Sequence, residues 1–134
     1  MAPRPSHLIV RNKYTGEPMA VPTSEIPQEV WPENWYDQPY WLHNPELQYL
    51  RPLMDDYLHN RELNPSQVKI LATYFLDYAC HIVIMGFLFG GGQEHVDLCL
   101  PYIRRLRALK EFAKTMEDLR TMIDVGMEYA LDPI

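Results

Sequence analysis

The sequence predicts a mainly α-helical protein, with a four-helix bundle-like domain over residues 44–134 and an extended arm over residues 1–43. Ten of the twelve prolines lie within the first 65 of the 134 residues, and proline at this density prevents long helices. The rest of the chain contains long apolar runs and capping signals typical of helices. At this length we expect one hydrophobic core and no second ordinary domain.

The arm is expected to begin with a short β-hairpin over residues 7–21. The apolar run HLIVRN is followed by the turn-like sequence KYTGEP and then by MAVP, a pattern that favours a hairpin around Thr15-Gly16. An isolated hairpin is only marginally stable in water. We therefore expect it to pack on the helices or on a neighbouring chain.

Residues 22–43 form the second part of the arm, which we call the strap. Four prolines interrupt it, so an extended conformation is expected. It also carries five aromatic side chains, of a kind enriched at binding hot spots because they bury a large area at low entropic cost. The strap either completes the chain's own core or anchors a partner. The predicted partner-binding residues are Trp31, Trp35, Tyr36, Tyr40 and Trp41.

Capping signals, prolines and glycines set the bounds of four predicted helices. Asn44-Pro45-Glu46 and Asn64-Pro65 each place a capping side chain before a proline with a preset φ, which is a helix start signal. Gly90-Gly91-Gly92 ends the second helix. Pro101 kinks the third helix or marks its start, and Thr115 to Asp118 form a capping box for the fourth. The predicted helices cover residues 45–59, 65–89, 94–114 and 116–130.

Residues 70–89 form the most apolar segment, with Asp77 as their one formal charge. As a helix, the segment is apolar all round in its last two turns and needs protein or lipid on every side. We expect packing within the chain or in a homodimer. Membrane insertion is less favoured, because a mid-span Asp costs about 3 kcal/mol. Small residues seven apart form a seam where another helix can approach closely; they are Ala72, Ala79 and Gly86.

Two pairs of potential metal ligands are spaced four residues apart on neighbouring predicted helices. If the glycine break folds these helices antiparallel, Asp77 and His81 would face His95 and Cys99, a set that can hold zinc tetrahedrally. None of the specific zinc-binding spacings is present, and an Asp–His ion pair beside an apolar cysteine explains the same residues. We therefore predict no metal and no cofactor, and keep a small metal-dependent or regulatory enzyme as an alternative.

The formal net charge of −6 at pH 7 argues against non-specific nucleic-acid binding, which requires a positive surface. One predicted helix nevertheless gathers its cations on one face, opposite an apolar face. This face is solvated, pairs with acidic residues of the segment 115–134 that follows it, or contacts a partner's acidic surface or a nucleic-acid backbone. We call it the basic strip; it consists of Arg104, Arg107, Lys110 and Lys114.

These patterns indicate a non-catalytic interaction, assembly or adaptor subunit that binds protein partners, or a second copy of itself, through the strap and the helix seam. A second alternative is an acidic inhibitor or an accessory subunit of a nucleic-acid complex. No catalytic signature is present. Two cysteines in apolar surroundings, Cys80 and Cys99, and the lack of a signal-peptide pattern at the start favour a cytoplasmic location.

Overall fold

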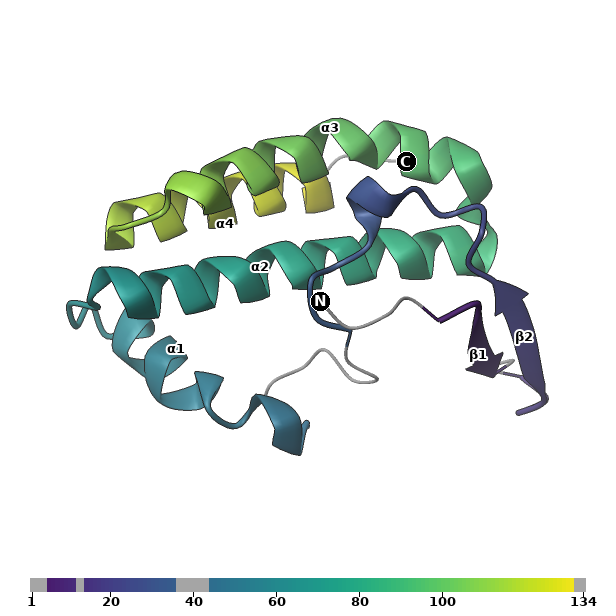
Figure 1. Ribbon diagram of the computed structural model, residues 1–134, viewed down its shortest axis with the longest axis horizontal. Coiled ribbons are helices and arrows are strands. Elements are labelled where there is room, and N and C mark those ends of the chain that lie inside the picture. Colours follow the sequence, from purple (N-terminus) through teal and green to yellow (C-terminus); the bar gives the residue numbers. More distant parts are fainter. Residues whose placement is uncertain (1–4, 12–13, 36–43, 132–134) are drawn as a thin grey trace.

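The computed structural model describes residues 5–11, 14–35 and 44–131. It is mainly helical and contains one two-stranded antiparallel sheet (Figure 1), which confirms the predicted class and the predicted hairpin. The elements are β1 (His7–Arg11), β2 (Pro18–Pro22), η1 (Gln28–Val30), η2 (Pro45–Leu47), α1 (Leu50–Leu58), α2 (Pro65–Gly86), η3 (Phe87–Gly91), α3 (Gly92–Phe112) and α4 (Met116–Leu131).

The chain reverses direction between α2 and α3 in a short turn where the backbone angles of Phe89 and Gly90 are not helical. The two helices are joined by the π-helical turn η3, and they run antiparallel (Figure 1). Gly90 has a φ of 114° and Gly92 a φ of 58°, values that only glycine adopts without strain. The predicted glycine break therefore reverses the chain. The predicted count of four separate helices is not confirmed, because η3 joins α2 directly to α3 with no separate loop between them.

The first helix begins later than predicted. Pro45–Leu47 forms only one 3₁₀ turn, capped by the side chain of Asn44, and α1 starts at Leu50. Pro52 explains the difference, since in a helix starting at residue 45 it would lie in the interior and break the hydrogen-bond ladder. In α1 it lies in the first turn, where N–H groups have no intrahelical acceptor in any case.

Capping boxes open α2 and α4; the box at Thr115 was predicted, and at Asn64 only the capping side chain was. The Oδ1 of Asn64 accepts the N–H of Gln67 at 2.9 Å, and the Oε1 of Gln67 accepts the N–H of Asn64 at 3.0 Å. The Oγ1 of Thr115 accepts the N–H of Asp118 at 3.2 Å, and the Oδ2 of Asp118 accepts the N–H of Thr115 at 3.0 Å. Each box satisfies N–H groups that a helix start leaves without acceptors.

The helix α3 contains Pro101 in its interior and ends at Phe112. Its last turn is held by α2, because the Nζ of Lys69 donates to the carbonyl oxygens of Lys110 and Glu111, both at 2.7 Å. A lysine at this place satisfies terminal carbonyls and complements the negative end of the helix dipole. The contact fixes the far end of the α2–α3 hairpin, while η3 fixes the near end.

The strap packs on the helices of its own chain. Its turn η1 lies on α2 and α3 on one side of the hairpin, and α4 packs against the same two helices on the other side (Figure 1). Ile26, Val30 and Trp31 are 2%, 0% and 5% exposed and belong to the hydrophobic core. In its described part, the strap therefore completes the core of this chain.

Within the described residues, one helical segment, Pro65–Phe112, is long and apolar enough to cross a membrane by length and composition alone. Its most apolar 18-residue window has a mean hydropathy of 1.6, and 56% of that window is buried inside the protein. A helix buried in a protein core also meets these criteria of length and composition. More than half of this window is thus already enclosed by protein.

Gly91→Ala is expected to destabilise the fold. A Cβ at Gly91 would lie 2.6 Å from the Cβ of His95 and 2.9 Å from the carbonyl oxygen of Gly86, and neither atom moves without the backbone. Overpacking of this kind costs about 1–3 kcal/mol, measurable as a lower free energy of unfolding in urea.

Gly126→Ala is the matched control for this prediction. Nothing lies within 4 Å of the Cβ position of Gly126, which is inside α4. Alanine has the higher helix propensity, so this change should stabilise the protein by about 0.5–1 kcal/mol. Equal effects of the two variants would contradict the close contact described at η3.

Candidate functional site

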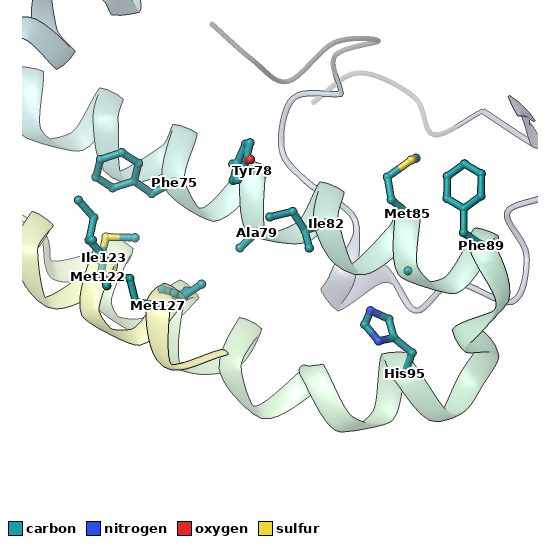
Figure 2. Close-up of a pocket in the computed structure, with 13 residues that line it drawn as sticks. Phe75, Tyr78, Ala79, Ile82, Met85, Phe89, His95, Met122, Ile123 and Met127 are labelled. Carbon is teal, nitrogen blue, oxygen red and sulfur yellow. The ribbon is translucent and has the colours of Figure 1, made fainter. Parts of the chain in front are cut away.

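An apolar groove with a volume of about 690 Å³ lies between α2, α3 and α4 (Figure 2). One wall is α2 from Phe75 to Gly86, continued by Phe89 of η3, and the other is formed by Met122, Ile123 and Met127 of α4. Ligand sites in proteins commonly have volumes of about 300–1,000 Å³ and apolar linings. The groove is therefore the leading candidate for a binding site.

Small residues create the hollow. Ala79 and Gly86, two of the three residues of the predicted seam, line the groove from α2, and Gly126 faces them from α4. The third seam residue, Ala72, is fully buried in the core. Gly86 also lets α3 come close, because the imidazole of His95 occupies the position that a Cβ of residue 86 would take. The seam thus seats α3 within the same chain and leaves space beside α4.

Several large side chains of the groove are exposed to solvent. The exposed fractions are 62% for Phe89, 56% for Met127 and 39% for Ile82. Exposed apolar side chains beside an apolar hollow are typical of interaction surfaces. Met85 and Met122 also line the groove, and methionine side chains adapt their shape to different apolar partners.

His95 closes the end of the groove next to η3 and is 6% exposed. The Sγ of Cys99 lies 3.9 Å from its Nδ1 and 3.8 Å from its Nε2. Nearly equal distances to both ring nitrogens place the sulfur against the ring instead of along one N–H direction. This contact packs the imidazole in place.

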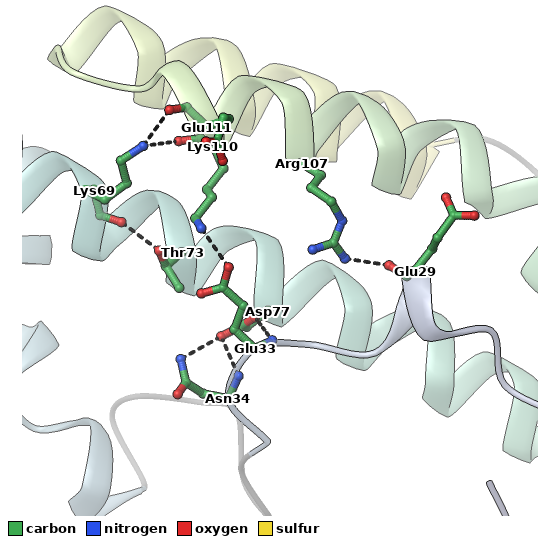
Figure 3. Close-up of polar contacts among 9 residues, drawn as sticks. All are labelled: Glu29, Glu33, Asn34, Lys69, Thr73, Asp77, Arg107, Lys110 and Glu111. Carbon is green, nitrogen blue, oxygen red and sulfur yellow. Dashed lines mark hydrogen bonds and ion pairs between the residues drawn. The ribbon is translucent and has the colours of Figure 1, made fainter. Parts of the chain in front are cut away.

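Asp77 holds the strap on the other side of α2 (Figure 3). Its Oδ1 accepts the backbone N–H of Glu33 at 2.8 Å, and its Oδ2 accepts the backbone N–H and the side-chain amide of Asn34, both at 3.2 Å. Asp77 is 3% exposed. Burial raises the pKa of Asp77 to about 6, although these hydrogen bonds favour its ionised form.

An aromatic stack continues this contact along α2. The rings of His81 and Trp35 are 4.7 Å apart, and Trp35 stacks on Trp31 at 5.1 Å. Burial lowers the pKa of His81, so its imidazole is neutral at pH 7. Two of the five aromatic residues predicted to bind a partner thus pack on their own chain. The other three, Tyr36, Tyr40 and Trp41, lie outside the described residues.

Three of the four basic-strip residues bind the strap. The Nε of Arg104 donates to the Oε2 of Glu29 at 2.7 Å, and Arg107 donates to the backbone carbonyl of Glu29. The Nζ of Lys110 pairs with the Oε1 of Glu33 at 2.7 Å (Figure 3). Among the described residues, the ion pairs of the strip are formed with Glu29 and Glu33 of the strap, and not with the acidic residues of segment 115–134 that were expected to bind it.

These ion pairs differ in their surroundings. The side chains of Arg104 and Glu29 are 58% and 51% exposed, and pairs exposed to this degree contribute little to stability. Lys110 is only 15% exposed, so its pair with Glu33 is less screened by solvent. The side chain of Lys114, the fourth strip residue, is exposed.

The four candidate metal ligands do not come together. Asp77 and His81 face the strap, and within the part of the chain that the structure describes, no group of three or more His, Cys, Asp or Glu side chains is placed to hold a metal ion. Gly86 is the α2 residue that meets His95. It lies nine residues after Asp77, which is about 180° around the helix, so the predicted facing arrangement is wrong.

The titratable groups beneath the strap do not form a reactive site. A hollow of about 210 Å³ adjoins Asp77, which is smaller than most ligand pockets, and the carboxylate is already bonded to the strap. Burial raises the pKa of Cys80 to about 12. The thiol is therefore protonated at pH 7 and unreactive as a nucleophile.

Comparisons of the chain with protein-family models, with curated proteins and with solved structures find no match. The interpretation of the groove therefore depends on its geometry and chemistry.

Two features of the site were missed from the sequence. The first is the α4 wall of the groove, where Ile123 and Met127 extend the apolar stripe beyond the buried Met122. The sequence does carry a signal for this wall, because the apolar stripe of this helix is wider than a single core contact requires. The second is the pairing of Glu29 and Glu33 with the basic strip, for which local sequence gives no signal.

Trp31→Ala is expected to lower the free energy of unfolding by about 3–5 kcal/mol, the usual cost of truncating a buried aromatic side chain. Phe112→Ala is the control, since Phe112 is 76% exposed and its loss should change stability by about 0.5 kcal/mol at most. Urea denaturation measures both. If Trp31→Ala is as mild as the control, the strap is not part of the core.

Asp77 is expected to make stability fall as pH rises. Its folded-state pKa of about 6 exceeds the ordinary value of 3.8, so the folded protein binds this proton more tightly than the unfolded chain does. The stabilisation is fully present below pH 3.8 and is lost as pH rises through about 6.

Asp77→Asn keeps a side-chain carbonyl for the strap amides but does not titrate. The free energy of unfolding of the wild type, relative to this variant, should fall by about 2–3 kcal/mol from pH 4 to pH 7. Urea denaturation at both pH values measures the difference. A difference that stays constant with pH would show that Asp77 titrates normally.

Proposed function

We propose that this protein is a non-catalytic interaction or assembly subunit that binds an amphipathic helix of a protein partner in the groove between α2, α3 and α4. The supporting observation is the apolar hollow of about 690 Å³, flanked by the exposed side chains of Phe89 and Met127. A hydrophobic groove that receives the apolar face of a helix is a common mode of peptide recognition.

The length of the groove fits this occupant. Its α2 wall runs from Phe75 to Gly86, which at about 1.5 Å per residue is about 17 Å. A helix of about three turns would present apolar side chains at positions i, i+3 or i+4, i+7 and i+11 along this length.

We propose the groove as the docking surface, whereas the sequence analysis assigned that role to the strap. Trp31 is 5% exposed and stacks on Trp35, whose ring contacts that of His81 at a tilt of 33°. The strap therefore supports α2 from the side opposite to the groove. In this proposal its described aromatic residues stabilise the wall against which the partner binds.

A nucleic-acid or catalytic role has less support. Arg104, Arg107 and Lys110 are already engaged by the strap, and phosphate binding would have to displace those contacts. The buried thiol of Cys80 is unreactive. Both cysteines are free and buried, which agrees with the proposed cytoplasmic location.

Photo-crosslinking in native lysate tests this proposal. Met127 in the groove wall and Phe112 outside it, which are 56% and 76% exposed, are each replaced by benzoylphenylalanine. We expect an adduct only from position 127, and its mass spectrum should map the partner contact to an amphipathic helical segment.

Ile82→Glu supplies the second arm of this experiment. The change puts a charge on an apolar groove wall at a side chain that is 39% exposed, so the fold should persist while the adduct falls about tenfold, a loss of about 1.4 kcal/mol in binding. Circular dichroism checks the fold. Equal adducts from positions 127 and 112, or an adduct unchanged by Ile82→Glu, would refute the proposal.

A further inference from the structure

We infer that the helix which fits the groove is cationic: it carries Lys or Arg on both sides of its apolar stripe, near the two ends of the groove. This inference rests on the proposed function and adds the chemistry of the partner. It follows from three observations, namely the internal use of the chain's cations, the carboxylates at the groove ends and the adaptable groove wall.

Most described cations are already used inside the molecule, although the chain has a formal net charge of −6. They bind strap residues, helix carbonyls or neighbouring carboxylates, and so add little free positive charge to the surface. These engaged side chains are Arg61, Lys69, Arg104, Arg105, Arg107, Lys110 and Arg120. The charge left to attract a partner is therefore negative.

Carboxylates lie near both ends of the groove. Glu94 is exposed and directly precedes His95, which closes one end. Asp124 is exposed and directly follows Ile123, which lines the groove near Phe75 at the other end (Figure 2). Neither carboxylate forms an ion pair with a described residue.

Arg120, one helical turn before Asp124 on α4, is paired within the chain. Its guanidinium donates to the Oδ1 of Asn60 at 2.8 Å and pairs with Glu117 at 3.5 Å. The charge of Asp124 therefore dominates the electrostatic potential at this end of the groove. A Lys or Arg at each end of a bound helix would meet an available carboxylate.

The charges discriminate between occupants more sharply than the apolar wall does. Met85, Met122 and Met127 can repack around many apolar faces, so the wall alone selects weakly. A second copy of this chain would bring another charge of −6 against the same carboxylates, and like charges at an interface oppose association. A cationic helix has both the shape and the complementary charge.

Three synthetic amphipathic helices of 18 residues test this inference. They share one apolar stripe and differ only in polar faces built from Lys, Gln or Glu. The ε-methyl NMR signals of Met85, Met122 and Met127 report on groove binding, and those of Met19 and Met54, which do not line the groove, are internal controls. At low salt, we expect the Lys peptide to bind about tenfold more tightly than the Glu peptide, with the advantage shrinking at high salt.

The paired variant Glu94→Gln, Asp124→Asn should remove most of this preference. Glu25→Gln with Glu46→Gln is the matched control, because it changes the net charge equally at exposed positions outside the groove lining and should keep the preference. Loss of the preference in both double variants would mean that net charge, and not the groove ends, attracts the peptide, and would overturn the inference.

The remaining outcomes separate this inference from the proposed function. If all three peptides shift the groove methyls with equal affinity, the charge inference fails and the helix-binding groove stands. If no peptide shifts them, both fail. If sedimentation equilibrium of the peptide-free protein shows a dimer that Ile82→Glu abolishes, the groove binds a second copy and the inference is overturned.

Discussion

The buried carboxylate of Asp77 is the contact on which the arrangement around α2 depends. It accepts hydrogen bonds from Glu33 and Asn34, and so ties an irregular segment without regular backbone pairing to the most apolar helix of the chain. Once the strap is held there, Trp31 and Val30 bury against α2 and α3. The strap then covers one side of α2 and leaves a hollow of about 210 Å³ there, whereas the groove on the side that faces α4 measures about 690 Å³.

Two opposing effects determine the pKa of Asp77. Desolvation disfavours the charged carboxylate, while the amides of the strap favour it. The nearby pair of Lys110 and Glu33 and the contact of Arg107 with the carbonyl of Glu29 hold the strap from α3. The strap is therefore anchored to both helices of the hairpin, which fixes their relative position and hence the shape of the groove on the other side.

The sequence predicted features that depend on neighbouring residues. The capping boxes at Asn64 and Thr115, the hairpin and the reversal near Gly90 all have local signals, because the groups that interact are only a few residues apart. The start of α1 was misplaced because the start signal at Asn44 was weighed without the later proline, Pro52.

The features that could not be predicted depend on contacts between distant parts of the chain. Glu29 and Arg104 are 75 residues apart, and Glu33 and Lys110 are 77 apart. The metal alternative failed because a helical wheel shows which residues share a face and does not show which face meets the next helix. The groove was missed for a related reason, since its two walls come from α2 and α4, which are not consecutive in the chain.

The long separation between the strap and its partners has a consequence for synthesis on the ribosome. Translation adds residues at about 5–20 per second from the N-terminus, so the strap emerges several seconds before the arginine and lysine side chains of α3 that bind it. During that interval the indole of Trp31 has no core to enter. The nascent chain must therefore keep this apolar segment from aggregating until α3 has been made.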